Sequence, residues 1–395
     1  MTERREVWIT GVGLLTCLGE GLETAWSRLE RGDPPVYDDK SFAPYIVHQL
    51  PAMSFDKHIP KKSDQRQMET WQRVGVYTAG MALTDAGIAG NAELLDRADM
   101  IVAAGGGERD TAVDTAIMAG MRNTNTRGAF LNERLMSDLR PTLFLAQLPN
   151  LLAGNISLVH GVVGSSRTFM GEEAAGVDAV RVAQARIAAG QSELTLVGGA
   201  YHGTRWDVLL AFELGGVVLK DKFAPVWDRG PGGGIAFATM GAFLVFESSA
   251  HAKARGAKPR ARISQVLSDR NARKGGEAEA SLRRQWNAIG PQIDRPHAAV
   301  ISGASGFEPA TSSERSVLKE IGLPVRNTGT YIGHGVDTQF MANLGIGCAA
   351  IEHGRLFAPT GSGDTGESPP GLSQVVVTSV GNWRGEGLAL LERVN

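Results

Sequence analysis

The sequence predicts an α/β fold built from two similar halves. Short apolar runs alternate with longer segments whose apolar residues recur about every 3.6 positions, the pattern of alternating strands and helices. Two of these runs end in glycine-rich stretches, VAAGGG and VISGASG, and a long helical pattern and another apolar run, LTLVGG or VVVTSVG, follow each. This recurrence indicates an internal duplication of one α/β unit. We assign residues 1–250 to the N-terminal half and residues 251–395 to the C-terminal half.

In the first half, the ends of the elements are marked by glycine and proline. The helix predicted at Leu22–Arg31 ends at Gly32, and the next helix ends at Gly87, a residue type common at helix C-termini. Met240-Gly241 between two apolar runs predicts a hairpin. The predicted strands are Val7–Thr10, Met100–Ala104, Leu194–Val197, Ile235–Thr239 and Ala242–Glu247, and the predicted helices are Leu22–Arg31, Met68–Ala86, Pro141–Leu158 and Glu172–Ala189.

The second half follows a polar, basic connection at Ala250–Pro259. Its predicted strands are Ala261–Leu267, Ala298–Ser302, Val375–Ser379 and Leu388–Glu392, and its predicted helices are Glu277–Ala288, Ser312–Ile321 and Gly335–Glu352. If the halves pack about a pseudo-twofold axis, the N-termini of helices 172–189 and 335–352 approach each other. Helix N-termini carry free N–H groups and partial positive charge. Glu173 would lie at one of them and His334 at the other, so we expect a functional site there.

The bulk composition excludes several classes of protein. The net charge of −2 and the isoelectric point near 6.5 provide no field that attracts nucleic acid or a membrane. No apolar stretch is long enough for a signal peptide or a membrane span, since Pro149 and polar residues interrupt the longest candidate, Leu143–Val163. Two cysteines, Cys17 and Cys348, argue for a reducing compartment, so we expect a cytoplasmic protein with both thiols packed inside.

Two glycine patterns suggest nucleotide binding only superficially. Gly11 and Gly13 follow a strand, but Thr16 replaces the third glycine of a dinucleotide fingerprint and no acidic residue follows at the usual distance. Gly230–Gly234 lacks the Gly-Lys-Ser/Thr of a P-loop and predicts a tight turn instead. We expect no nucleotide, no metal and no other cofactor.

Six segments resemble, in order and spacing, the characteristic segments of β-ketoacyl–acyl carrier protein synthases, the condensing enzymes. They are VWITGVGLLTCLGEGLETAW, RQMETWQRVGVYTAGMALTDAG, RPTLFLAQLPNLLAGNISLVHGVVG, QARIAAGQSELTLVGGA, FAPVWDRGPGGGIAFATMGAFLVFES and TGTYIGHGVDTQFMANLGIGCAAIEHG. The resemblance runs from residue 6 to about residue 394. It implies the thiolase fold, with two duplicated halves in a five-layered αβαβα arrangement.

The resemblance also places the catalytic positions of the family on this chain. The family uses a cysteine at a helix N-terminus, where a thiolate is favoured, together with two histidines and a lysine. The cysteine position falls on Glu173 and the second histidine on His334. The first histidine position falls on Gly303 or, with a different anchor, on Ala304, and the lysine position falls on Gly329. The glycine-phenylalanine gate of the family maps onto 380–385 without its phenylalanine.

These losses imply a subunit that does not condense acyl chains. A carboxylate at position 173 cannot form the usual thioester, and an acyl anhydride would hydrolyse readily. Glu173 also suits a helix N-terminus for structural reasons alone, worth about 0.3–1 kcal/mol, and we favour this interpretation. For a lone His334 we likewise favour a structural hydrogen bond. The pattern is closest to the chain-length-factor partners of type II polyketide synthases, which pair with a cysteine-bearing synthase in fatty acid or polyketide assembly. Two alternatives stay open: a decarboxylase or acyltransferase using Glu173 and His334, and an acyl-chain-binding homodimer.

Two groups of residues are candidates for contacts with partners. A basic cluster could dock an acidic acyl carrier protein, or it is simply a solvated helix face; its members are Lys57, Lys61, Lys62, Arg66 and Arg73. By resemblance, the segment 110–121 lies near a dimer interface, where four residues could line a partner's acyl tunnel or pack in the core of this chain: Ala116, Ile117, Met118 and Met121.

A dimer is the expected assembly. By the resemblance, the strand formed by Arg167, Thr168, Phe169 and Met170 would span the interface between two subunits. An exposed strand edge is costly for an isolated chain. We therefore expect a homodimer, or a heterodimer with a cysteine-containing synthase.

Overall fold

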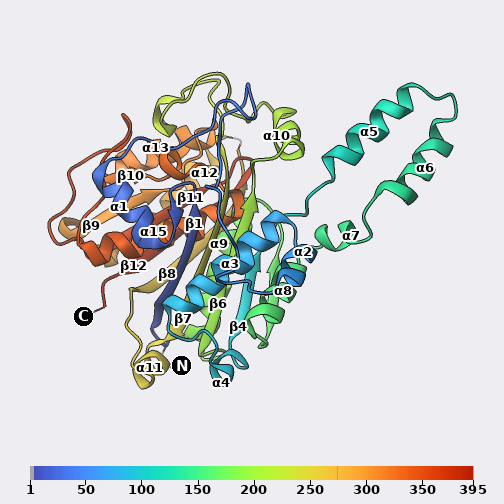
Figure 1. Ribbon diagram of the computed structural model, residues 1–395. Helices are drawn as coiled ribbons and strands as arrows, with labels where there is room; N and C mark the ends of the chain where they lie inside the picture. Colours follow the sequence, from blue (N-terminus) through green and yellow to red (C-terminus); the bar gives the residue numbers. More distant parts are fainter. Residues whose placement is uncertain (1–3, 274, 395) are drawn as a thin grey trace.

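A twelve-stranded mixed sheet organises the computed structural model, which describes residues 4–273 and 275–394 (Figure 1). The main path has the order β10-β9-β11-β12-β8-β1-β7-β6-β4-β5, with β2 on β1 and β3 on β7. The strands are β1 (Val7–Thr16), β2 (Gly19–Glu20), β3 (Val47–His48), β4 (Asp99–Ala103), β5 (Ser166–Phe169), β6 (Leu194–His202), β7 (Phe237–Ser248), β8 (Ala261–Ala272), β9 (Ala298–Ser302), β10 (Val325–Asn327), β11 (Gln374–Val380) and β12 (Arg384–Glu392).

The strand order confirms the duplication. Reading outward from the centre, β1-β7-β6-β4-β5 has two antiparallel pairs followed by two parallel pairs, and β8-β12-β11-β9-β10 repeats this sequence of pairings. Among the described strands, the two halves of the sheet are joined by the short β1–β8 pairing, where Trp8 pairs with Arg262 and Ile9 with Ala261.

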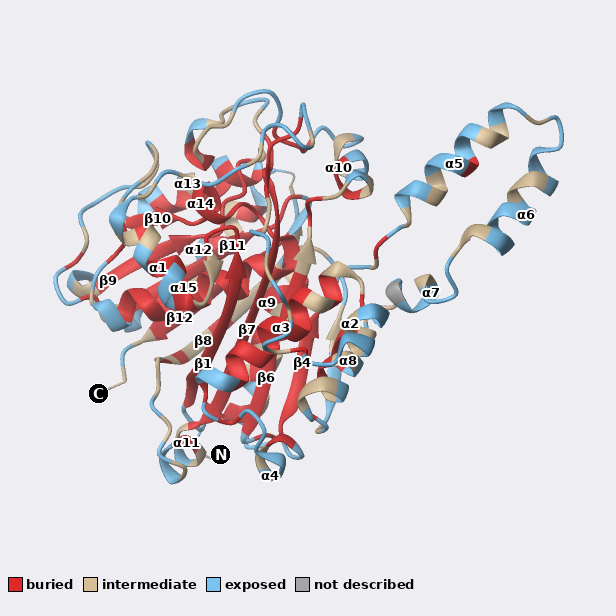
Figure 2. Cartoon of the chain, in the orientation of Figure 1, coloured by how far each residue is buried: buried red, intermediate tan, exposed pale blue. Residues whose placement is uncertain are grey.

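Helices form three layers around the two half-sheets, which gives the five-layered thiolase arrangement (Figures 1 and 2). One core joins α9 and α15 to strands of both halves, a second joins α3 and α8 to the N-terminal half, and a third joins α12 and α13 to the C-terminal half. The helices are α1 (Leu22–Arg31), α2 (Lys62–Gln67), α3 (Thr70–Asp85), α4 (Ala92–Leu95), α5 (Thr111–Arg122), α6 (Arg127–Asp138), α7 (Leu143–Ala146), α8 (Leu151–His160), α9 (Glu173–Ala188), α10 (Trp206–Glu213), α11 (Ser249–Ala254), α12 (Glu277–Ile289), α13 (Ala310–Ile321), α14 (Gly329–Ile332) and α15 (Gln339–His353), with 3₁₀ turns η1 (Val226–Asp228), η2 (Gly290–Gln292), η3 (Arg295–His297) and η4 (Val336–Thr338).

The glycines of β1 explain why this strand follows a G-x-G pattern. A Cβ on Gly13 would lie 2.1 Å from the carbonyl oxygen of Thr78, and one on Gly11 would lie 2.5 Å from that of Ala82. Helix α3 therefore packs directly on the backbone of β1. The pattern serves helix–strand packing, which agrees with the prediction that it is not a nucleotide fingerprint.

Three predicted elements are wrong in shape. The hairpin predicted at Met240-Gly241 is instead one continuous strand, β7. Gly241 is not a turn residue: it makes room for the Thr78 side chain, since a Cβ there would lie 2.3 Å from Thr78 Oγ1. The helix predicted at 141–158 is split into α7 and α8, consistent with Pro149, which disfavours helix in the residue before it. The helix predicted to begin at Gly335 begins at Gln339, after η4.

Helices α5 and α6 form an arm, residues 110–145, that projects away from the rest of the chain (Figures 1 and 2). Its root is held by Glu108, whose carboxylate accepts hydrogen bonds from the backbone N–H of Trp71 (2.8 Å) and from His202 Nδ1 (2.9 Å). Most of its residues are exposed, including Met136, which is 80% exposed.

None of the helices in the described part of the chain has both the length and the apolar composition of a membrane span. Both cysteines are free and buried, as predicted, and the Gly230 carbonyl accepts a hydrogen bond from the Gly233 N–H in the predicted tight turn.

Candidate functional site

The start of α9 and the segment before α15 meet in the interior, and their contact forms the candidate site. Glu173 is the first residue of α9, and its Oε1 lies 3.1 Å from Nε2 of His334. The side chain of His334 is 3% exposed and that of Glu173 is 4% exposed. The sequence predicts this proximity, although the two residues are 161 positions apart.

The backbone of His334 is fixed as an addition to strand β7. Its N–H donates to the carbonyl of Ala236 (2.9 Å), and its own carbonyl accepts from the N–H of Ala238 (3.0 Å). The preceding Gly333 has φ +68°, and a Cβ there would lie 2.6 Å from the ring of His48. Glycine is required at this point both by the backbone and by the close ring.

Asp337 is the residue of this site that sequence reasoning missed. It lies in η4 and is fully buried; Thr338 Oγ1 donates to its Oδ1 (3.2 Å), whereas its Oδ2 has no hydrogen-bond partner among the described residues. Burial raises the pKa of Asp337 to about 7, and the nearby Glu173 adds to that rise. The available signal was its position three residues after His334, as the only acidic residue in the sequence from 329 to 351.

We predict that Asp337 makes the free energy of unfolding fall as pH rises from about 4 to about 7. The folded chain holds a proton on this carboxyl up to about pH 7, whereas its ordinary pKa is 3.8, so the folded state binds more protons across the window. The contribution is at most about 1.4 kcal/mol per pH unit. Urea unfolding of the parent chain and of Asp337→Asn, at several pH values, measures it. Because Glu314 is also buried with a raised pKa, the difference between the two chains is the quantity to follow, and parallel curves contradict the prediction.

The resemblance assigns the first histidine of the family to Gly303 and its lysine to Gly329, and both positions are crowded. A Cβ on Gly303 would lie 2.5 Å from the carbonyl oxygen of Thr378 in β11. A Cβ on Gly329, at the start of α14, would lie 3.2 Å from both Asn327 Oδ1 and Val226 Cγ2. The backbone of β11 therefore blocks a side chain at position 303, whereas one at position 329 would be in tight contact with its neighbours; Ala304 is buried without a polar group.

The predicted interface residues lie at the edge strand β5 and on helix α5 of the arm. Strand β5 pairs only with β4 among the described strands, so its other edge has no strand partner there. Arg167 and Met170 are exposed, whereas Thr168 and Phe169 are half-buried. In α5, Ala116 is exposed, Met118 is 58% exposed, Met121 is half-buried and Ile117 is buried.

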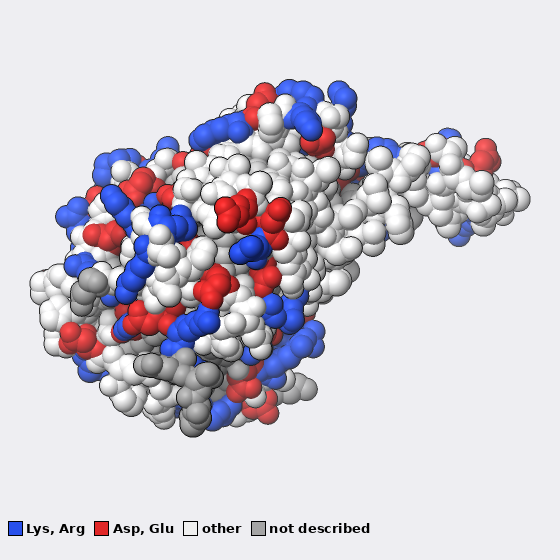
Figure 3. All heavy atoms as spheres, turned by 90° about the horizontal axis from the view of Figure 1, so that it is seen from below, with Lys and Arg blue, Asp and Glu red and all other residues white. Residues whose placement is uncertain are grey.

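The predicted basic cluster runs from the turn before α2, which holds Lys57, over α2 to the start of α3, and part of its charge is neutralised. Lys57 pairs with Glu20 (2.6 Å). Lys62 pairs with Asp56, and the guanidinium of Arg73 lies over the ring of Phe55, 5.7 Å from its centroid. Lys61 and Arg66 are exposed. On the face shown in Figure 3, basic and acidic side chains are interspersed, and the arm carries few charges.

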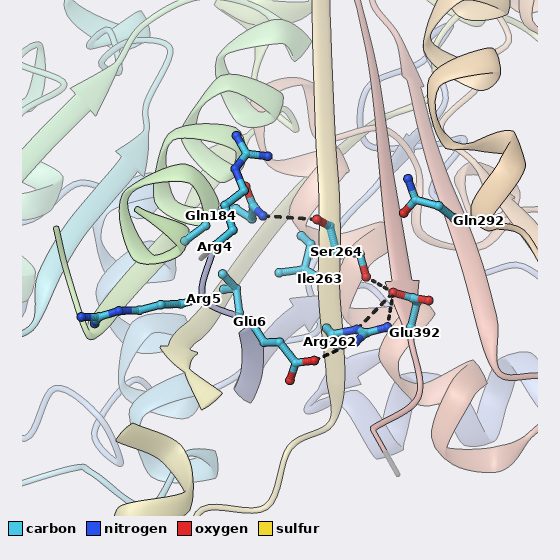
Figure 4. A pocket seen from close by; sticks show the side chains of 11 residues that line it. Arg4, Arg5, Glu6, Gln184, Arg262, Ile263, Ser264, Gln292 and Glu392 are labelled. Atoms are coloured by element: carbon cyan, nitrogen blue, oxygen red, sulfur yellow. Dashed lines mark hydrogen bonds and ion pairs between the residues drawn. The ribbon is translucent and has the colours of Figure 1, made fainter. Parts of the chain in front are cut away.

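A separate cavity of about 400 Å³ lies between the N-terminal segment, α9 and strands β8 and β12 (Figure 4). Its charged groups are largely paired, since Arg262 binds both Glu6 (2.9 Å) and Glu392 (2.8 Å). None of the predicted site residues lines it. Among the described residues, no group of three or more His, Cys, Asp or Glu side chains is placed to hold a metal ion.

Comparison with known proteins extends these observations. Residues 4–241 match the family model "Beta-ketoacyl synthase, N-terminal domain". The chain is 24% identical to the 3-oxoacyl-[acyl-carrier-protein] synthase 2 of Vibrio harveyi over 84% of this chain and 82% of that protein. It is also 24% identical to the protein of that name from Vibrio cholerae, over 65% of this chain and 61% of that protein. Among solved structures, the ishigamide ketosynthase/chain length factor superposes with a TM-score of 0.80 and 18% identity, over 99% of this chain and 100% of that one.

Proposed function

The chain belongs to the β-ketoacyl synthase family, and from that premise we propose that it is a non-condensing member, the partner subunit of a cysteine-bearing synthase in fatty acid or polyketide assembly. The observation that carries the proposal is Glu173, an acid at the first position of α9, hydrogen-bonded to His334 in the interior. A carboxylate there cannot hold an acyl chain as a thioester. By the resemblance, the glycines at positions 303 and 329 remove two further groups that the family chemistry uses, and a backbone carbonyl 2.5 Å from a Cβ at position 303 leaves no space for a side chain there.

The exposed surfaces support a partner role. The unpaired edge of β5 and the apolar side chains of the arm would be costly in water. Met118, Met136 and Phe144 are 58%, 80% and 68% exposed, which suits a contact with a second subunit of similar fold. In this proposal the arm reaches the acyl tunnel of the partner and influences product length, while Lys61, Lys62, Arg66 and Arg73 dock the acyl carrier protein.

The same proposal covers the organisation and location of the chain. The halves 1–250 and 251–395 contain strands β1–β7 and β8–β12, respectively. Two buried free thiols suit a reducing compartment, so we place the protein in the cytoplasm.

Two measurements test the proposal. We predict that the purified chain forms no covalent acyl adduct with an acyl-loaded carrier, as read by mass spectrometry of the intact protein. We also predict that it copurifies with a cysteine-bearing homologue and changes the chain length of the product. Met136→Asp on the arm should weaken that association at least about tenfold, because it buries a charge at an apolar contact.

Leu214→Asp is the matched control, since Leu214 is 92% exposed and follows α10 rather than lying on the arm. Equal effects of the two substitutions, or a stable acyl adduct, would contradict the proposal.

A second candidate function rests on the same hydrogen bond. A carboxylate that holds an imidazole in place is also the arrangement of a general base, so the chain could decarboxylate malonyl-carrier or transfer an acyl group. Release of carbon dioxide that disappears in both Glu173→Ala and His334→Ala would establish this activity instead. Lipid that copurifies with a homodimer would favour the third candidate, an acyl-chain-binding protein.

A further inference from the structure

The turn between β11 and β12 lies directly on the first turn of α9, above the candidate site. This turn, Gly381–Gly385, is the region where the sequence resembles the gate of the family. A Cβ on Gly381 would lie 3.0 Å from Glu173 Oε2, and a Cβ on Gly385, which has φ +89°, would lie 2.7 Å from the Cβ of Ala174. Only glycine allows the turn to approach the site this closely.

Arg273, the residue after β8, holds both ends of the turn. The N–H of Gly381 donates to the carbonyl of Gly385 (2.9 Å), which closes the hairpin. Arg273 Nε donates to the Gly381 carbonyl (2.7 Å) and Nη2 donates to the Gly385 carbonyl (2.7 Å). Its Nη1 forms an ion pair with Glu386; the Arg273 side chain is 7% exposed and that of Glu386 is 0% exposed.

Each of the three residues between these ends has its own contact with a different element. Ser305 Oγ donates to Asn382 Oδ1 (3.1 Å). The ring of Trp383 stacks on Phe212 of α10, with centroids 5.4 Å apart and planes at 21°. Arg384 Nε donates to Glu172 Oε2, in the residue before α9 (3.3 Å).

We propose that this turn is a fixed lid that keeps the Glu173–His334 site closed to an acyl chain and its carrier arm. The inference rests on the proposed function and deepens it: the chain excludes the substrate that its family loads, rather than only lacking the group that binds it. To open, the lid must lose the Arg273 contacts, including a buried ion pair, and the separate contacts of Asn382, Trp383 and Arg384. The open state is therefore a rare local unfolding event.

Cysteine labelling measures access to the site. In Glu173→Cys, iodoacetamide should react about 100-fold more slowly with the folded chain than with the chain in denaturant. The parent chain provides the blank, because its two cysteines are buried. Adding Trp383→Ala and Arg384→Ala to Glu173→Cys should speed the reaction at least about tenfold, because the contacts of these two residues with Phe212 and Glu172 are lost.

Trp206→Ala in the same background is the matched control, since Trp206 is 41% exposed, close to the 43% of Trp383, but contacts Phe42 and Tyr45 instead of the turn. Because all of these variants carry the same introduced thiol, its pKa affects their labelling rates alike and does not enter the comparison. Fast labelling of Glu173→Cys itself, or equal rates in the three backgrounds, would overturn the lid.

Hydrogen exchange of the unmodified chain gives a second test that needs no substitution. The amide of Gly381, bonded to Gly385 within the turn, should exchange as slowly as those of β11. Exchange as fast as that of an exposed loop would also overturn the lid. Slow labelling in a chain that never associates with a synthase would remove the partner role alone, whereas fast labelling in a chain that does associate would remove the lid alone.

Discussion

Arg273→Ala is expected to lower the free energy of unfolding by about 3–5 kcal/mol, because it leaves the carboxylate of Glu386 buried without its cation. The substitution also removes the donors to the carbonyls of Gly381 and Gly385. Urea unfolding followed by circular dichroism measures the loss.

Arg270→Ala is the matched control, since Arg270 lies near the end of β8, three residues before Arg273, with an exposed side chain, and its effect should stay within about 0.5 kcal/mol. Adding Glu386→Gln to Arg273→Ala should restore part of the loss, because the uncompensated charge is then gone. Similar losses in Arg273→Ala and Arg270→Ala would show that the buried pair does not hold the hairpin.

Gly176→Ala is expected to cost about 3 kcal/mol, although alanine is ordinarily the better residue inside a helix. A Cβ on Gly176 would lie 2.0 Å from the carbonyl oxygen of Asp337, so α9 and η4 would have to separate. That separation also pulls Glu173 from His334. Thermal and urea unfolding would report the loss.

Gly154→Ala is the matched control within α8. Its Cβ would meet only Leu151 Cδ2 at 3.8 Å, an ordinary contact, so this substitution should stabilise the chain by about 0.5–1 kcal/mol. If Gly176→Ala were also stabilising, the close packing of α9 on η4 would be contradicted.

Much of the fold could be predicted because local signals mark where elements end. Leu22–Arg31 and Ala298–Ser302 match the observed elements residue for residue, and each is followed by glycine, Gly32 or Gly303. The glycine at position 241 misled the prediction because its role is tertiary: it makes room for Thr78 of a helix far away in the sequence. The helices of the arm were not assigned; their side chains lie mostly in solvent, so a buried core did not mark them.

The candidate site was likewise predictable only in part. The duplication and the motif spacing predicted that Glu173 and His334 face each other, because equivalent helices of the two halves begin at one place. The lid was not predictable, since Arg273 and Glu386 are 113 positions apart and nothing in either segment identifies its partner. The unusual protonation of Asp337 depends on burial, which only the folded structure shows.

The central place of β1 has a consequence for how this chain is made. Its first residue, Val7, pairs with Ser248, so the neighbour of this apolar strand leaves the ribosome roughly 240 residues later. At about 5–20 residues per second, that delay is on the order of 10–50 seconds. For this time the apolar β1 lacks its long-range partner strand, so it stays exposed to chaperones during translation.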